Sequence, residues 1–145
     1  MADGNHTPRV LVDDRQDAAL DLAGLVALAA ECLAGEGEPA SELSLSFVTE
    51  EEIADLHLRY MAEEGSTDVL SFPLDERDED GVWILGDVVI APSVAARNNA
   101  ADPAAELRLL LVHGILHLLG HDHEEAEERA RMWAIQERYT GVRVP

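Results

Sequence analysis

Four histidines lie within the eleven-residue segment HGILHLLGHDH, which spans 113–123. His113 and His117 are four positions apart, so on a helix their imidazoles point from one face, one turn apart. Gly120 allows the chain to reverse, which would bring His123 back as a third nitrogen ligand. Three histidine ligands leave one tetrahedral position open, as is typical of a catalytic zinc site. The spacing therefore predicts one Zn²⁺ ion held by His113, His117, His123 and a water molecule.

The alternative is that these histidines are ordinary core residues. A single histidine on an apolar helix usually is one. Two at this spacing, followed by two more after a glycine, fit that explanation poorly, because desolvating several imidazoles without partners is costly. An all-imidazole ligand set also favours Zn²⁺ over Ca²⁺ or Mg²⁺, which prefer oxygen. We therefore predict a metal site.

One position separates this segment from a zinc protease. The pattern H-E-x-x-H-x-x-G-x-x-H is matched throughout except at Gly114, which stands where the glutamate belongs. That glutamate is the general base of peptide hydrolysis. The segment thus keeps the ligand spacing of a protease and lacks its base, which argues against a peptidase of the usual kind.

Composition limits the partners. The 145 residues include 30 acidic and ten basic residues, giving a formal net charge of −20, and every basic residue is arginine. A strongly acidic surface repels nucleic acid in general, which argues against a sequence-independent coat protein for DNA or RNA, and no DNA partner is expected. A metal ion that neutralises phosphate would still permit a nuclease. The single cysteine, Cys32, and the lack of a signal or membrane-spanning segment predict a cytoplasmic protein.

The elements that must position the histidines can be read from periodicity. Strand patterns cover 9–15, 42–49, 68–73 and 83–92, and helical patterns cover 17–34, 49–62, 93–100, 103–119 and 124–139. The helix 103–119 is apolar nearly all round, so we expect it to be central and buried. We expect the acidic run 75–81 to be a solvated hairpin loop. The order predicts one α+β domain over 1–145, with a mixed sheet of about four strands packed against helices.

Capping residues mark the expected ends of these elements. Thr49, followed three positions later by Glu52, is the start of a capping box. Asp102 before Pro103 predicts an N-cap with proline at the first helical position. Gly120 predicts the end of the histidine-bearing helix.

The segment HGILHLLGHDH resembles the H-G-x-L-H-L-x-G-[YH]-D-H signature of the YbeY family, bacterial metalloendoribonucleases of ribosomal RNA maturation. STDVLSFPLD (66–75) and LGDVVIAP (85–92) also resemble segments of that family, and the resemblance covers roughly residues 9–140. It implies a zinc-dependent, single-strand-specific endoribonuclease that acts on the 3′ end of 16S rRNA and in ribosome quality control. The implied partners are single-stranded rRNA and the small ribosomal subunit.

The chain departs from the family at one arginine. Many members carry an arginine directly after a tyrosine of the second helix, and here Met61 follows Tyr60 at that place. Arg59, about 100° away on the helix, is a candidate catalytic substitute. The alternative is a surface arginine that pairs with acidic residues.

His121 is the second catalytic candidate, because it stands beside the expected metal loop and could move protons. Asp122 either shares that role or orients a ligand histidine through a hydrogen bond. Two other functions stay open: a metal-dependent hydrolase of another substrate, such as peptide, or a non-catalytic zinc-containing ribosome assembly factor. The sequence predicts no oligomeric state.

Overall fold

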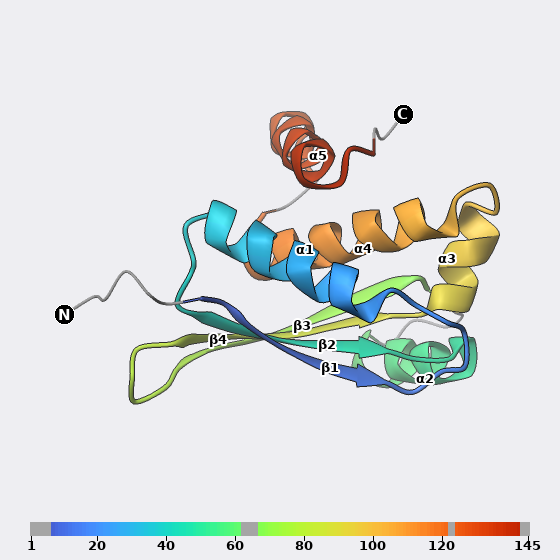
Figure 1. Ribbon diagram of the computed structural model, residues 1–145, viewed down its shortest axis with the longest axis horizontal. Coiled ribbons are helices and arrows are strands. Elements are labelled where there is room, and N and C mark those ends of the chain that lie inside the picture. The colour runs from blue at the N-terminus through green and yellow to red at the C-terminus, as the bar shows by residue number, and fades with distance from the viewer. Residues whose placement is uncertain (1–6, 62–66, 122–123, 143–145) are drawn as a thin grey trace.

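A computed structural model describes residues 7–61, 67–121 and 124–142, which form a mixed four-stranded sheet and five helices (Figure 1). The strands are β1 (Arg9–Asp14), β2 (Ser41–Phe47), β3 (Val69–Arg77) and β4 (Trp83–Ile90). The helices are α1 (Leu22–Gly35), α2 (Glu50–Met61), α3 (Pro92–Asn98), α4 (Pro103–Leu118) and α5 (Ala126–Thr140). The strand order is β1-β2-β4-β3, with β3 antiparallel to its neighbour and the other pairings parallel. The predicted α+β class and mixed sheet are confirmed.

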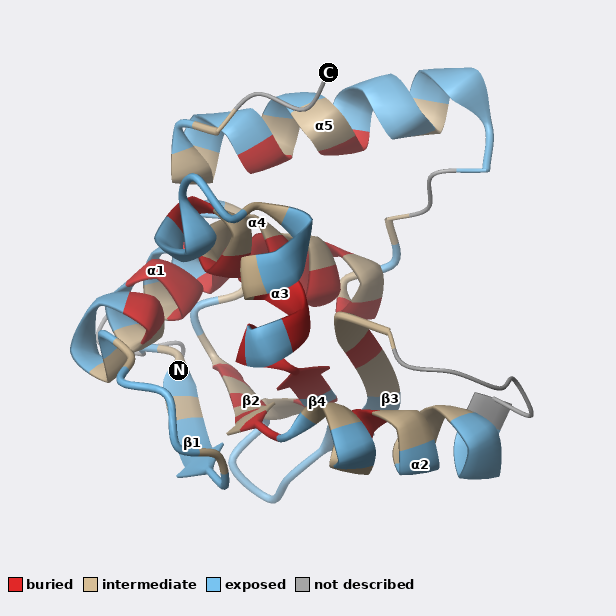
Figure 2. Ribbon diagram, turned by 90° about the vertical axis from the view of Figure 1, so that its right-hand side faces the viewer, coloured by how far each residue is buried: buried red, intermediate tan, exposed pale blue. Residues whose placement is uncertain are grey.

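The helices form layers on the sheet. Figure 1 shows α1 and α4 side by side on one face, with α5 outside them, and α2 on the opposite side of the sheet. The core lies under α1 and α4, where Figure 2 shows most of the buried residues. The strand β2 alternates as its sequence predicts, and Leu43, Leu45 and Phe47 are all fully buried in this core.

Helix α4 is the centre of the molecule, as its apolar sequence predicts. Nine of its sixteen residues are buried. Its start is fixed by Asp102, whose side chain accepts a hydrogen bond of 3.1 Å from the Ala105 backbone N–H, with Pro103 at the first position. None of the helices formed by the described residues is long and apolar enough to cross a membrane.

Helix α4 ends in a Schellman motif. Gly120 has a φ of 99°, a left-handed conformation that side chains disfavour. Its N–H donates to the His117 carbonyl at 3.0 Å, and the His121 N–H donates to the Leu116 carbonyl at 2.9 Å. The predicted stop at Gly120 is confirmed, and the turn fixes the backbone of His121 against the last turn of the helix.

The prediction of a loop over 75–81 was wrong at its start. The strand β3 runs through Pro73 to Arg77, with a register shift between Pro73 and Glu76, and residues 78–82 connect it to β4. Trp83 explains this extension. Its indole N–H donates to Asp75 at 2.6 Å, and the Arg77 guanidinium lies 5.5 Å from the indole ring. Asp75 is therefore bonded across an exposed hairpin, where the charge of the acidic run costs little.

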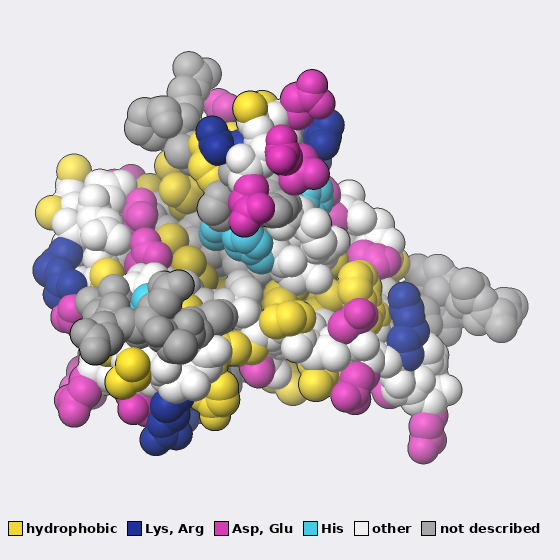
Figure 3. Space-filling model, turned by 180° about the vertical axis from the view of Figure 1, so that it is seen from behind, with side chains coloured by type: hydrophobic (Ala, Val, Ile, Leu, Met, Phe, Trp, Pro, Cys, Tyr) yellow, Lys and Arg dark blue, Asp and Glu magenta, His cyan; other side chains and the backbone are white. Residues whose placement is uncertain are grey.

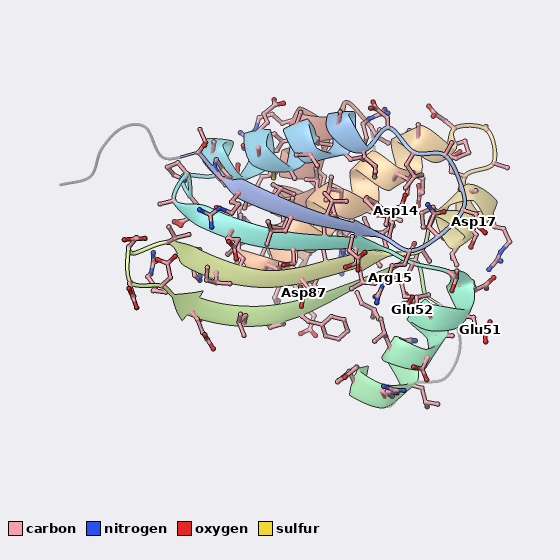
Figure 4. All side chains as sticks on the ribbon, turned by 60° about the horizontal axis from the view of Figure 1, so that its bottom comes forward. Asp14, Arg15, Asp17, Glu51, Glu52 and Asp87 are labelled. Carbon is pink, nitrogen blue, oxygen red and sulfur yellow. The ribbon has the colours of Figure 1, made fainter. Side chains whose placement is uncertain are left out.

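Two helix starts differ from the patterns. The helix α1 begins at Leu22 and not at 17, because the Asp21 side chain caps it by accepting from the Gly24 N–H at 3.0 Å. For α2, the Thr49 hydroxyl accepts from the Glu52 N–H at 3.1 Å, which confirms that half of the capping box. The Glu52 carboxylate pairs with Arg15 at the end of β1 (Figure 4).

The helix α5 is attached to both α1 and α4. Met132 is fully buried in the main core. Near the end of α5, the Tyr139 hydroxyl donates to the Glu36 carboxylate at 2.7 Å, and Arg138 pairs with the same carboxylate at 3.2 Å. Burial, and next the bond to Glu36, raise the pKa of Tyr139 to about 12. The last helix is thus fixed by packing at one point and by a charged network at the other.

Cys32 gives a direct test of this packing. Its side chain is fully buried, and burial, then the charges of Glu36 and Glu31, raise the pKa of its thiol to about 12. An unperturbed thiol has a pKa of about 8.5. Iodoacetamide at mildly alkaline pH is therefore expected to alkylate the native protein orders of magnitude more slowly than the urea-unfolded chain, as followed by mass spectrometry. Equal rates for the two states would show that α1 is not packed as described.

Candidate active site

The histidine pair lies at a cleft between α4 and β3. His113 and His117 are partly exposed on one face of α4, with ring centroids 4.7 Å apart and planes at 80°. Together with β3 residues they line a cavity of about 390 Å³. Figure 3 shows histidine side chains at a hollow in this face of the molecule. The prediction that these two imidazoles share one helix face is confirmed.

The strand β3 supplies the opposite wall. Val69, Leu70, Ser71 and Pro73 of this strand all line the cavity. Because β3 is an edge strand of the described sheet, Pro73 breaks no interior ladder there. Phe72 points to the other side, where it meets Tyr60 edge-on at 5.6 Å. The cleft therefore has mostly apolar walls and imidazoles as its main polar groups.

Gly114 is the closest contact between α4 and the sheet. A Cβ atom placed on it would lie 2.8 Å from Cγ1 of Val88, which is fully buried in β4. The Ser71 hydroxyl donates to the Gly114 carbonyl at 3.2 Å. The residue at the place of the protease glutamate is therefore turned into packed sheet, and a side chain there would push α4 away from β4.

Gln136 is a site residue that the sequence did not reveal. It lies on α5 with 2% of its surface exposed, and its Oε1 atom is 2.7 Å from Nδ1 of His113. A carboxamide oxygen only accepts, so Nδ1 carries the proton and Nε2 carries the lone pair. Trp133, also on α5, packs against the same ring with centroids 6.0 Å apart. The one available signal was an amide on the apolar face of α5, four residues after Met132.

Of the other predicted site residues, the structure describes only His121 and Arg59, and neither lines this cleft. His123 and Asp122 lie outside the described residues, so the third ligand stays a prediction. In the described ranges alone, no group of three metal-binding side chains is found. His121 lines a separate, smaller cavity. Arg59 is exposed, with its Nε 3.3 Å from the Asp55 carboxylate, and it does not line the histidine cavity.

The paired histidines lie on a buried helix at a cleft beside a mixed sheet, an arrangement that suits the active site of an enzyme. A sequence model described as endoribonuclease YbeY matches residues 12–141. The chain belongs to the YbeY family, as its sequence motifs predict.

Curated relatives and a solved structure agree. The endoribonuclease YbeY of Parafrankia sp. is 49% identical over 110 residues, which cover 68% of this chain and 69% of that protein. Those of Frankia casuarinae and Streptomyces coelicolor are 48% and 46% identical, over 55% and 67% of their lengths. The chain thus spans between about half and two thirds of these relatives. The solution structure of TM1509 from Thermotoga maritima matches with a TM-score of 0.62 and 28% identity, covering 92% of this chain and 86% of that one.

The contact at Gly114 predicts an unusual response to alanine. In an ordinary helix interior, Gly114→Ala would stabilise by about 1 kcal/mol. Here the added methyl meets the stiff Val88 side chain, so we expect a net loss of about 1–2 kcal/mol in the free energy of urea unfolding. In a Val88→Ala background the methyl has room, and the same change should cost less. Equal costs in both backgrounds would contradict the contact.

Proposed function

We propose that this chain, as one domain, is a zinc-dependent endoribonuclease that hydrolyses phosphodiester bonds of single-stranded rRNA, including the 3′ end of 16S rRNA. The observation that carries the proposal is the histidine pair at the α4–β3 cleft, with the His113 ring oriented by Gln136. Membership of the YbeY family supports the choice of RNA over other substrates. A role in ribosome quality control, a cytoplasmic location and the small ribosomal subunit as partner follow from the family resemblance.

The donor set suits one Zn²⁺ ion. The bond from His113 Nδ1 to Gln136 leaves Nε2 as the ligating nitrogen, and His117 lies one turn further along the same face. His123 completes the set in this proposal. When bound, the ion supplies a Lewis acid that offsets negative charge on a phosphate oxygen.

The chain's own residues prepare the cleft for that substrate. Val69, Pro73 and Leu118 line it with apolar surface, which lowers the local dielectric and strengthens electrostatic contacts. The imidazoles place the reacting phosphate at the α4 side of this wall. The cavity of about 390 Å³ has the size of a small-ligand site, so in this proposal a single unpaired nucleotide enters it.

The proton carriers remain proposals. His121 has a fixed backbone, because its N–H bonds to the Leu116 carbonyl, and we retain it as a general acid or base. Arg59 contacts substrate only by giving up its ion pair with Asp55. Gly114 faces the packed sheet and has no side chain, so position 114 supplies no general base in place of the protease glutamate.

Cleavage assays decide between this function and its rivals. Purified protein with Zn²⁺ is expected to cut single-stranded RNA, to lose this activity in EDTA and to regain it when Zn²⁺ is restored. His117→Ala should remain folded by circular dichroism and lose at least about 100-fold in rate, because a ligand is removed. His57→Ala, on α2 outside the cleft, is the matched control and should cleave normally.

Two outcomes would reject the proposal. Cleavage of a peptide or ester panel without cleavage of RNA would assign another substrate. Unfolding of His117→Ala together with loss of bound metal would favour a structural metal in a non-catalytic assembly factor.

The hydrogen bond to Gln136 predicts a second-sphere effect on the metal. Gln136→Met keeps the volume but removes the acceptor, so zinc affinity measured by competition with a chromogenic chelator should fall about 10–100-fold. Gln136→Glu restores an acceptor for the His113 N–H and should bind zinc far better than Gln136→Met. Gln16→Met, in an exposed turn after β1, is the control. Unchanged affinity in Gln136→Met would remove the orienting role.

A further inference from the structure

We propose that Arg131 forms a phosphate-binding subsite in the cavity that it lines with His121, and that this subsite holds the backbone of a nucleotide next to the one that is cut. The inference rests on the proposed function. It assigns a substrate contact to α5, a helix that carries no part of the histidine motif.

The arginines of the described residues are mostly committed to other partners. Five pair with carboxylates: Arg9, Arg15, Arg59, Arg97 and Arg138. Two donate to backbone carbonyls: Arg77 and Arg129. Within the described ranges, only Arg108 and Arg131 show neither kind of contact. In a chain with a net charge of −20 and no lysine, these two are the side-chain cations most available to a polyanion.

Arg131 lies beside His121, at the end of α4 that carries the histidine motif. With His121, Gly120 and Glu128 it lines a cavity of about 120 Å³. Pockets that enclose drug-sized ligands begin at roughly 300 Å³, so this one suits a phosphate group better than a whole nucleotide. Arg131 is exposed and offers a planar fork of donors, which matches phosphate oxygens.

Both His121 and Arg131 of this cavity are close in sequence to residues of the histidine site. His121 follows His117 by four residues, through the Schellman motif that fixes its backbone. Arg131 precedes Gln136 by five residues on α5, about 7.5 Å along the helix axis. Gln136 in turn bonds His113. In this proposal one strand of RNA contacts both sites.

Glu128 is the feature that sets the strength of this subsite. It lines the same cavity one turn before Arg131, and no ion pair joins the two among the described contacts. Its carboxylate repels a phosphate, so it lowers the affinity of the subsite for RNA. Removing the Glu128 charge is therefore expected to tighten RNA binding, whereas removing the Arg131 charge loosens it. Opposite effects from neighbouring residues are not expected from a general loss of folding.

The need for such a contact follows from the charge of the chain. An acidic surface repels the phosphates that flank the scissile bond, while a metal ion neutralises charge at one phosphate only. Arg108 cannot serve, because it lines a cavity with Asp21 and Ala104 at the opposite end of α4. It is consequently the matched control.

The test measures binding of a short fluorescein-labelled single-stranded RNA to the zinc-loaded protein by anisotropy, with RNA integrity checked on gels. Arg131→Gln should raise Kd about tenfold at low salt and reduce the slope of log K against log salt by about 0.7. In cleavage, KM should rise with kcat nearly unchanged. Glu128→Gln should lower Kd about twofold to threefold, and Arg108→Gln should match the unmodified protein.

The outcomes separate the two proposals. If the unmodified protein cleaves RNA and Arg131→Gln binds with the same Kd and salt slope, the subsite is wrong and the proposed function stands. An equal loss in Arg108→Gln and Arg131→Gln would mean that only overall charge matters, which also rejects the subsite. If the unmodified protein neither binds nor cleaves RNA, both proposals fail.

Discussion

The structure depends on one helix that must meet two opposing demands. Helix α4 is the centre of the core, with nine of its sixteen residues buried, and it must also present His113 and His117 to a cleft. Gly114 makes this possible, because only a residue without a side chain lets α4 lie so close to Val88. That approach fixes the distance between the helix and β3, and hence the width of the cleft. Helices α1, α3 and α5 all pack against α4.

Acidic and basic side chains are distributed unevenly over the surface around this core. The chain carries three acidic residues for every basic one. Most of the arginines that the structure describes form ion pairs with carboxylates such as Glu42, Glu50 and Glu36. The acidic excess therefore faces solvent, while the cleft between α4 and β3 is lined by apolar side chains and imidazoles. A surface of this kind keeps nucleic acid away from most of the molecule. A polyanion can therefore bind only at the few surface regions that are uncharged or positively charged.

Features of local origin could be predicted from the sequence. The ends of α4 are set by Asp102, Pro103 and Gly120 through contacts within a few residues. In β2, the alternation of apolar and polar residues predicts which side chains are buried. Contacts between distant segments could not be predicted. Gln136 reaches His113 from another helix, and the need for glycine at 114 depends on where Val88 falls in β4. The extension of β3 to Arg77 was missed because an acidic run favours a loop, and the pairing of Arg77 with Trp83 that extends the strand does not show in that pattern. The third ligand, His123, stays a sequence prediction.

The bond between His113 and Gln136 also has a consequence for timing. Helix α5 is synthesised after α4, so a chain that has just completed HGILHLLGHDH contains the histidines but not the acceptor that orients one of them. The ring is held in place only once α5 has emerged and docked through Met132 and Tyr139. Order of synthesis thus keeps the site immature on the nascent chain.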